Sequence, residues 1–157
     1  MTGRIGRHGA LIAIVATAVV GGAIILSAYV HAQSQSKSLY ARLGGYDAIA
    51  AVTDDFLGQL AGDPQLSKFF VGHSTDSLHR IRQLVVDQLC AATGGPCFYI
   101  GRDMKTSHKG LGITEANWQA TVKHLVASLD KFKVGETEKN EVLSALTKLK
   151  SDIVEKP

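Results

Sequence analysis

The sequence predicts an all-α domain over residues 39–157, preceded by an apolar N-terminal segment. Apolar residues recur every three or four positions through most of this domain, and no run of alternating apolar and polar residues indicates a strand. The chain is 45% hydrophobic and 20% charged, with three prolines and two cysteines. This composition excludes a disordered chain, a collagen-like chain and a disulfide-dense scaffold. Residues 9–30 carry no charged side chain.

The charge balance excludes nucleic acid as a partner. The formal net charge is +3, and Arg4 and Arg7 supply two of the 17 basic residues, while all 14 acidic residues follow position 33. The rest of the chain is therefore nearly neutral. A nucleic-acid interface would require basic residues clustered on one face.

The segment 9–30 has the length of a membrane-spanning helix. As a helix it would extend roughly 33 Å, close to the ~30 Å hydrocarbon core of a bilayer. Arg4, Arg7 and His8 precede it, and the retention of positive charge inside the cell predicts a cytoplasmic N-terminus with the domain outside.

Two alternatives remain for this segment. Residues 1–32 form either a single-pass anchor in the cytoplasmic membrane or a signal peptide cleaved after Ala32, where Val30-His31-Ala32 has a small-x-small pattern. The domain is then periplasmic in both cases, anchored or secreted. Residues 33–38 (QSQSKS) form a short linker.

Glycines and polar caps delimit the expected helices in the first half of the domain. A short helix begins at Leu39 and ends at Gly44-Gly45, and a second follows at once and ends at Gly62-Asp63-Pro64. An apolar corner spans residues 66–70. A long helix, which can be capped within Ser74–Ser77, then ends at Gly94-Gly95-Pro96; its predicted inward stripe is Leu78, Ile81, Val85, Leu89 and Ala92.

Three further helices are expected. A short one carries Met104, His108 and Leu111 on one face and closes at Gly110 and Gly112. Thr114 caps the next, whose predicted inward side chains run from Trp118 to Phe132. The last begins at Thr137, after Gly135, and continues to Ile153. Six helices of this size leave limited apolar area for a core, so a large flat cofactor beside His108 would fill the middle.

Four segments together resemble the truncated haemoglobins of group I. These are LYARLGGYDAI (39–49), FLGQLAGDPQLSKFF (56–70), ATGGP (92–96) and YIGRDMKTSHKGLGIT (99–114). The resemblance covers the chain from about Leu39 to its end. It implies a shortened globin, a two-over-two helical sandwich around haem b.

The resemblance implies that His108 is the proximal ligand of the haem iron. A neutral ring nitrogen supplies the axial lone pair, and the sixth position stays open for O2, NO or CO. Arg80 matches a basic position suited to a haem propionate, although a solvated arginine is the alternative. The residues that the resemblance places around haem are Phe56, Leu57, Phe70, Arg80, Ile81, Leu84, Val85, Tyr99, Met104 and Leu111.

The distal side departs from the family pattern. Leu57 stands where the family often has tyrosine, and Ile81, Leu84 and Val85 make the pocket apolar. Faster release of oxygen is expected, because a bound gas would lack a hydrogen-bond donor. The segment between Phe70 and Ile81 is about three residues longer than in familiar members, which leaves open a register that turns Gln83 or Gln88 inward.

Cys90 and Cys97 are the two cysteines, seven positions apart across Gly94-Gly95-Pro96. Export would permit a disulfide between them. The alternative is two buried thiols that pack as small apolar side chains.

Three functions are compatible with these observations. The first is reversible binding of a diatomic gas at haem iron held by His108, with no catalytic residue, for oxygen transport or NO handling. The second is an NO dioxygenase, which oxidises NO with bound O2 and needs an external reductase. The third is a membrane-tethered helical interaction module without haem.

Overall fold

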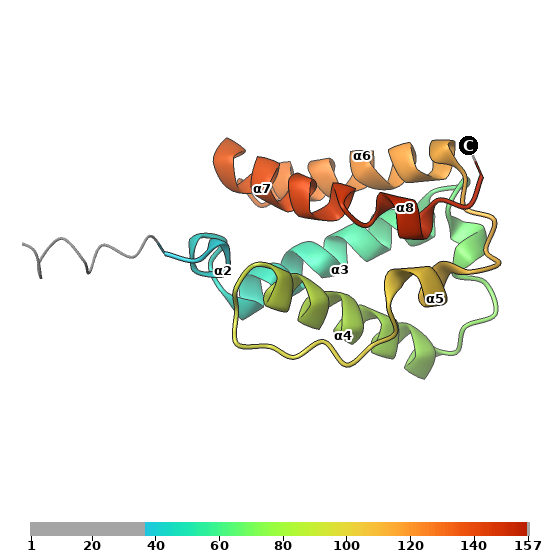
Figure 1. Ribbon diagram of the computed structural model, residues 1–157, viewed down its shortest axis with the longest axis horizontal. Helices are drawn as coiled ribbons and strands as arrows, with labels where there is room; N and C mark the ends of the chain where they lie inside the picture. The colour runs from blue at the N-terminus through green and yellow to red at the C-terminus, as the bar shows by residue number, and fades with distance from the viewer. Residues whose placement is uncertain (1–36, 157) are drawn as a thin grey trace, which may run out of the picture. The chain divides into compact units, whose positions relative to one another are not determined.

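The computed structural model describes residues 37–156, and this part of the chain is all-α, as predicted. It contains seven α-helices and one short 3-10 helix: α2 (Leu39–Arg42), α3 (Tyr46–Gly62), η1 (Ser67–Phe69), α4 (Thr75–Ala92), α5 (Met104–His108), α6 (Glu115–Lys131), α7 (Glu136–Thr147) and α8 (Lys150–Ile153). Helix α3 packs against both α4 and α6, and α6 also packs against α7. The pair α6 and α7 therefore lies over the pair α3 and α4 (Figure 1). The short α5 packs against α8.

Local signals in the sequence account for the helix ends. Gly44 follows α2 with a φ of 97°, in the left-handed region where a side chain would be strained. The Ser74 side chain accepts a hydrogen bond from Ser77 N and caps α4. Thr114 and Asn117 form a capping box at the start of α6.

The structure corrects the expected C-terminal half in three places. The short helix α5 ends at His108, so Leu111 lies in the following turn and not on the same helical face. The last helix is interrupted after Thr147, where Leu149 N donates to Leu146 O and the chain turns before α8. Phe132, expected inward, lies one residue past α6 and is 41% exposed.

The buried apolar residues form two clusters. The first lies between α3, α6 and α7 and contains Val52, Phe56, Leu60, Leu66, Leu125, Leu129 and Val142. The second joins α3 to the end of α4 through Ile49, Val86 and Cys90. Leu43, which follows α2, packs against both clusters.

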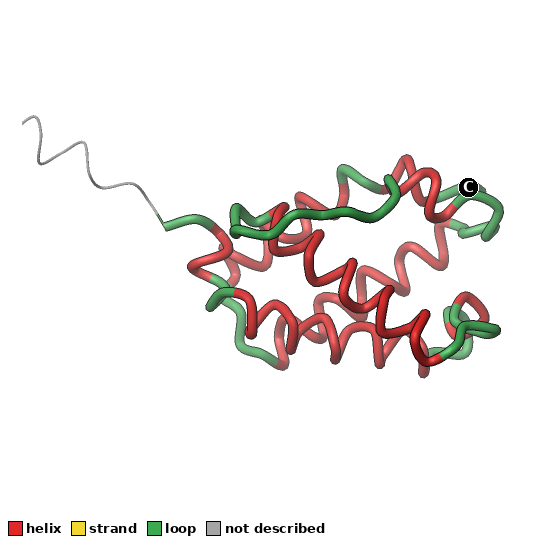
Figure 2. The backbone as a smooth tube through the Cα atoms, turned by 90° about the horizontal axis from the view of Figure 1, so that it is seen from below, coloured by secondary structure: helices red, strands yellow, loops and turns green. Residues whose placement is uncertain are grey.

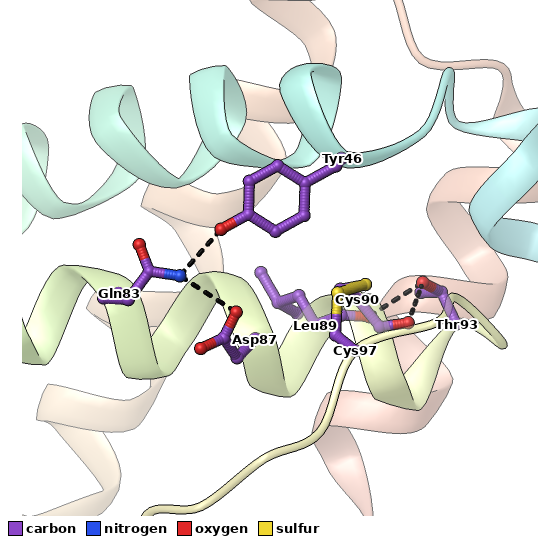
Figure 3. Close-up of a disulfide and its surroundings, with 7 residues drawn as sticks. All are labelled: Tyr46, Gln83, Asp87, Leu89, Cys90, Thr93 and Cys97. Atoms are coloured by element: carbon purple, nitrogen blue, oxygen red, sulfur yellow. Dashed lines mark hydrogen bonds between the residues drawn. A yellow bond between two sulfur atoms is a disulfide. The ribbon is translucent and has the colours of Figure 1, made fainter.

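A disulfide fixes the start of the long loop between α4 and α5, which contains no helix (Figure 2). Cys90, fully buried near the end of α4, is bonded to Cys97 with a Cα–Cα distance of 5.8 Å (Figure 3). Of the two alternatives for the cysteines, the structure therefore contains the disulfide and not two separate thiols. A Cβ on Gly95 would stand 2.5 Å from Tyr40 and 2.7 Å from the Cys90 sulfur, so this turn requires glycine.

The N-terminal segment predicted to span a membrane, residues 9–30, lies outside the described residues. Within residues 37–156, no helix combines the length and apolar character needed to cross a bilayer.

A partly buried hydrogen-bond network joins α3 to α6. The Asp55 carboxylate accepts hydrogen bonds from Ser128 Oγ (2.7 Å) and Gln59 Nε2 (2.7 Å) and forms an ion pair with Lys131. Ser128 is fully buried. The Lys131 ammonium, followed by the Ser128 and Gln59 donors, lowers the pKa of Asp55 to about 2. The charged carboxylate thus stabilises the contact between the two helices.

The same network continues to the one histidine of α6. His124 Nδ1 lies 3.0 Å from Gln59 Oε1, and its Nε2 lies 2.8 Å from the Asp63 carboxylate. The hydrogen bond from His124 is the largest cause of a lowered pKa at Asp63. His124 therefore has two protein partners and a structural role.

We expect Asp55→Asn to destabilise the protein near neutral pH but not in strong acid. Because folding lowers the pKa of Asp55, its stabilisation is present above the unfolded-state pKa near 3.8 and is lost as the pH falls through about 2. Urea unfolding followed by circular dichroism at several pH values measures the difference from wild type. Asp47→Asn, at an exposed position in the first turn of α3, is the control. A difference in unfolding free energy between Asp55→Asn and wild type that stays constant down to pH 2 would contradict the interpretation.

Candidate functional site

His108 occupies the last position of α5, and the start of that helix is fixed by a cap. Asp103 accepts hydrogen bonds from Thr106 N (2.7 Å) and Thr106 Oγ1 (3.0 Å). The backbone N–H of Thr106, more than its hydroxyl, lowers the pKa of the Asp103 carboxyl. A charged cap also interacts favourably with the positive end of the helix. The cap thus stabilises the first turn of the five-residue helix that carries His108.

The ring of His108 is half-buried and has a defined tautomer. Its Nδ1 lies 2.8 Å from Met104 O. A carbonyl oxygen can only accept, so Nδ1 carries the proton and the lone pair resides on Nε2. A neutral imidazole held in this way can serve as an axial ligand for a metal, because its other nitrogen is already satisfied.

The backbone after His108 turns sharply and is held from the C-terminus. Leu111 N donates to His108 O at 3.2 Å, and Gly110 and Gly112 take φ values of 84° and 65°. Both glycine N–H groups donate to the carboxylate of Glu155. These two bonds, Gly110 first, lower the pKa of Glu155, with a smaller contribution from the charge of Lys156. The sequence alone does not indicate Glu155, because a contact 45 positions away leaves no local signal.

Several apolar side chains of α4 and α5 are not part of the protein core. Ile81, Leu84 and Val85 are half-buried and belong to neither apolar cluster, and the same is true of Met104. Leu111 is 45% exposed. An apolar cofactor would cover such surface, which otherwise costs about 25 cal/mol for each Å² left in water. The structure therefore fits the expectation of a large flat group at these positions.

The donor set fits haem better than a metal held by protein alone. In residues 37–156 there is no group of three or more His, Cys, Asp or Glu side chains that could hold a metal ion. Haem iron needs only one or two ligands from the protein, because the porphyrin supplies four nitrogens. One histidine with an available ring nitrogen, together with apolar side chains that belong to neither cluster, suits this cofactor.

Three side chains from the N-terminal half that are predicted to contact haem lie in or against the first apolar cluster. Phe56 is buried on α3, and Leu57 and Phe70 are half-buried and pack against the same cluster. These side chains stabilise the core whether or not a cofactor is bound. Leu57 carries no hydrogen-bonding group, so this position on α3 offers no donor.

The predicted polar contacts are placed as follows. Arg80 is exposed in α4, where its guanidinium is accessible. The Tyr99 hydroxyl donates to Arg102 O at 2.6 Å, and its ring lies so close to Gly101 that a Cβ there would stand 2.3 Å from the Tyr99 oxygen. Tyr99 therefore braces the loop before α5 with its own hydroxyl engaged.

Gln83 is also engaged elsewhere. Its amide nitrogen donates to the Tyr46 hydroxyl (2.7 Å) and to Asp87 (2.9 Å), as Figure 3 shows. The bond to Tyr46 directs Gln83 toward α3, and the side chain is exposed. Gln88 is half-buried and makes no side-chain hydrogen bond to a described residue. Gln83 thus lies outside the apolar row Ile81, Leu84 and Val85.

The structure also contains an apolar cavity in another part of the domain. It is a cavity between α3, α4, α6 and α7, and none of the residues predicted to contact haem lines it. Its walls are Leu43, Ala48, Ile49, Val52, Leu89, Thr93, Leu125, Leu129, Val134 and Val142.

Comparisons with known proteins agree on one family. The family model described as bacterial-like globin matches residues 38–155. The group 1 truncated hemoglobin GlbN of Mycolicibacterium paratuberculosis is 33% identical over 121 residues, which cover 77% of this chain and 87% of that protein. A group 1 truncated hemoglobin of Tetrahymena pyriformis is 28% identical over 123 residues, covering 78% of this chain and 99% of that protein.

Solved structures give the same result. The crystal structure of the truncated hemoglobin from Tetrahymena pyriformis in its Fe(III) form matches with a TM-score of 0.69 and 27% identity, covering 75% of this chain and 98% of that one. A 2/2 hemoglobin from a Synechococcus species, which carries covalently attached heme, matches with a TM-score of 0.69 and 26% identity over the same shares.

Proposed function

The chain belongs to the bacterial-like globin family, and on this premise we propose that it binds a diatomic gas reversibly at haem iron held by His108. Its cofactor is haem, because the globin relatives and their structures are haem proteins with iron. When bound, haem iron supplies an open sixth position that takes O2, NO or CO. The residues of this chain hold the cofactor and keep the pocket apolar.

One observation carries the assignment of the ligand. The hydrogen bond from His108 Nδ1 to Met104 O leaves Nε2 as a lone-pair donor. His124, by contrast, has both ring nitrogens occupied by Gln59 and Asp63. Of these two half-buried histidines, only His108 has a nitrogen available for iron.

The pocket that this proposal describes is apolar on its distal side. Ile81, Leu84 and Val85 from α4 are expected to face the cofactor together with Leu57 from α3. None of these side chains can donate a hydrogen bond to a bound gas. Rapid release of O2 follows, since a polar ligand gains no stabilisation beyond its bond to iron.

We expect His108→Gly to lose haem. The substitution removes the axial bond, and imidazole added to the solution should restore binding by entering the space that the side chain leaves. The measurement is the Soret absorption of the full chain after hemin addition and gel filtration. The exposed histidine variant His73→Ala is the control. Wild-type haem content in His108→Gly without imidazole would contradict the assignment.

We expect Leu57→Tyr to slow O2 dissociation by roughly 10- to 100-fold. A hydroxyl at this position could donate to the bound gas, and a hydrogen bond to a charged or strongly polar acceptor is worth about 1.5–3 kcal/mol. Stopped-flow displacement of O2 by CO measures the rate.

Gln83→Ala is the matched control for that experiment. Its amide is held by Tyr46 and Asp87, so its removal should leave the O2 dissociation rate unchanged. A faster rate in this variant would mean that Gln83 reaches the ligand and that the pocket is not apolar.

The dioxygenase alternative differs in needing an electron donor. Each turnover leaves the iron oxidised, and a reductase must restore it. We propose gas binding as the function, because reversible binding needs no electron donor. NO consumption that requires O2 and is sustained by an added reductase would reverse that choice.

We further propose that residues 1–32 export the globin and that uncleaved residues 9–30 retain it in the cytoplasmic membrane, with the domain outside. Two features support export. Residues 9–30 are uncharged and follow Arg4 and Arg7. Cys90 and Cys97 form a disulfide, which persists in oxidising compartments and is rare in the cytosol.

Fractionation of cells that express the full chain tests export. We expect the protein to remain with the membranes in alkaline carbonate and to have no thiol that a maleimide can label before reduction. A soluble periplasmic protein beginning at Gln33 would identify the segment as a cleaved signal. Recovery from the cytoplasm with both thiols labelled would contradict export.

A further inference from the structure

The last described residues of the chain are attached to the start of α6. Glu155 N and Lys156 N both donate to Ile113 O, at 2.9 and 3.2 Å, and Glu115 N donates to Lys156 O at 3.1 Å. Thr114 and Lys156 form an isolated parallel bridge. Ile113 is buried. These bonds place the side chain of Glu155 beside the turn that comes after α5, where α8 also packs (Figure 1).

The Glu155 carboxylate binds this turn with both of its oxygens. Oε1 accepts from Gly110 N and Oε2 accepts from Gly112 N, each at 2.5 Å. Hydrogen bonds to an ionised acceptor are stronger than those between neutral groups. Because α5 ends at His108 and the two glycines have positive φ, no helical bond holds these two N–H groups. One side chain thus satisfies two donors within four residues of the histidine.

The turn is covalently continuous with the histidine that would bind iron. His108 O accepts from Leu111 N, which lies between the two clamped glycines. The backbone of residues 108–112 is therefore fixed at three N–H groups. A helix of five residues is too short to hold its own last residue in place. The position of its C-terminal end therefore depends on this turn.

We propose that Glu155 is a positioning residue for the proximal histidine. Its carboxylate fixes the turn after α5, and the fixed turn sets the direction in which His108 Nε2 points. The bond to Met104 O sets the rotation of the ring, and the Glu155 clamp sets the position of the backbone that carries it. This inference rests on the proposed function, because it assumes that His108 binds haem iron.

Glu155→Gln in the full-length holoprotein tests the proposal. Glutamine has nearly the same size but only one acceptor oxygen, so one glycine N–H loses its partner and the charge is removed. We expect the iron–histidine stretching band of the ferrous, gas-free protein to broaden or shift in resonance Raman spectra. We also expect haem transfer to apomyoglobin to become about 10-fold faster, the lower end of the effect of losing an outer-shell partner of a metal ligand.

Asp152→Asn is the matched control, since it removes one negative charge from α8 three positions earlier and leaves the two glycine N–H groups bound. It should keep the wild-type band and the wild-type rate of haem transfer. Glu155→Asp keeps the charge but is shorter by one methylene group. It should change the band in the same direction as Glu155→Gln, and it serves as the second variant if glutamine prevents folding.

The outcomes separate this inference from the proposed function. A wild-type protein that takes up no hemin would overturn both. A wild-type protein that holds haem through His108, together with folded Glu155 variants whose Raman band and haem transfer are unchanged, would overturn the positioning role alone. A general loss of stability does not by itself alter the iron–histidine band, so the band distinguishes positioning from folding.

Discussion

A histidine that binds iron must present one ring nitrogen to the metal while the other remains protonated and bound to an acceptor. Here the hydrogen bond between His108 Nδ1 and Met104 O, at 2.8 Å, meets the second part of that condition. The donor and the acceptor lie within the same helix of five residues. The surrounding structure serves to keep that short helix in place: Asp103 caps its start, and the C-terminal segment holds the turn after it.

The division of the core explains how so small a domain accommodates a cofactor. One apolar cluster joins α3 to α6 and α7, and the other joins α3 to the end of α4. The side chains on α4 and α5 that face the proposed haem site, Ile81, Leu84, Val85 and Met104, belong to neither. Haem would complete the core at these positions, so its binding should stabilise the fold by mass action. In this domain the cofactor is a structural element as well as a functional one.

The helices could be predicted from the sequence because their ends depend on neighbouring residues. Gly44, Ser74 and Thr114 each end or cap a helix through contacts within a few positions. Contacts between distant parts of the chain could not be predicted in this way. The direction of Gln83 depends on the hydroxyl of Tyr46, which lies 37 positions earlier.

The candidate site follows the same rule. The spacing of His108 and of the α4 stripe, together with the family resemblance, predicts one ligand and an apolar wall, and both remain predictions. Periodicity extends α5 as far as Leu111, because a repeat of apolar residues alone cannot show where a helix stops. Its true end is held by a residue from the last part of the chain, through a contact that no local pattern records.

The disulfide between Cys90 and Cys97 makes the stability of the domain depend on the redox conditions around it. Closing a loop of this size contributes about 2 kcal/mol in a chain-entropy account. Under the proposed export, a copy that stays in the reducing cytosol would lack this contribution. Differences of that size alter steady-state abundance several-fold, because proteases and chaperones remove the less stable form. If export holds as proposed, the same short crosslink would bias the cell's quality control against molecules that are not exported.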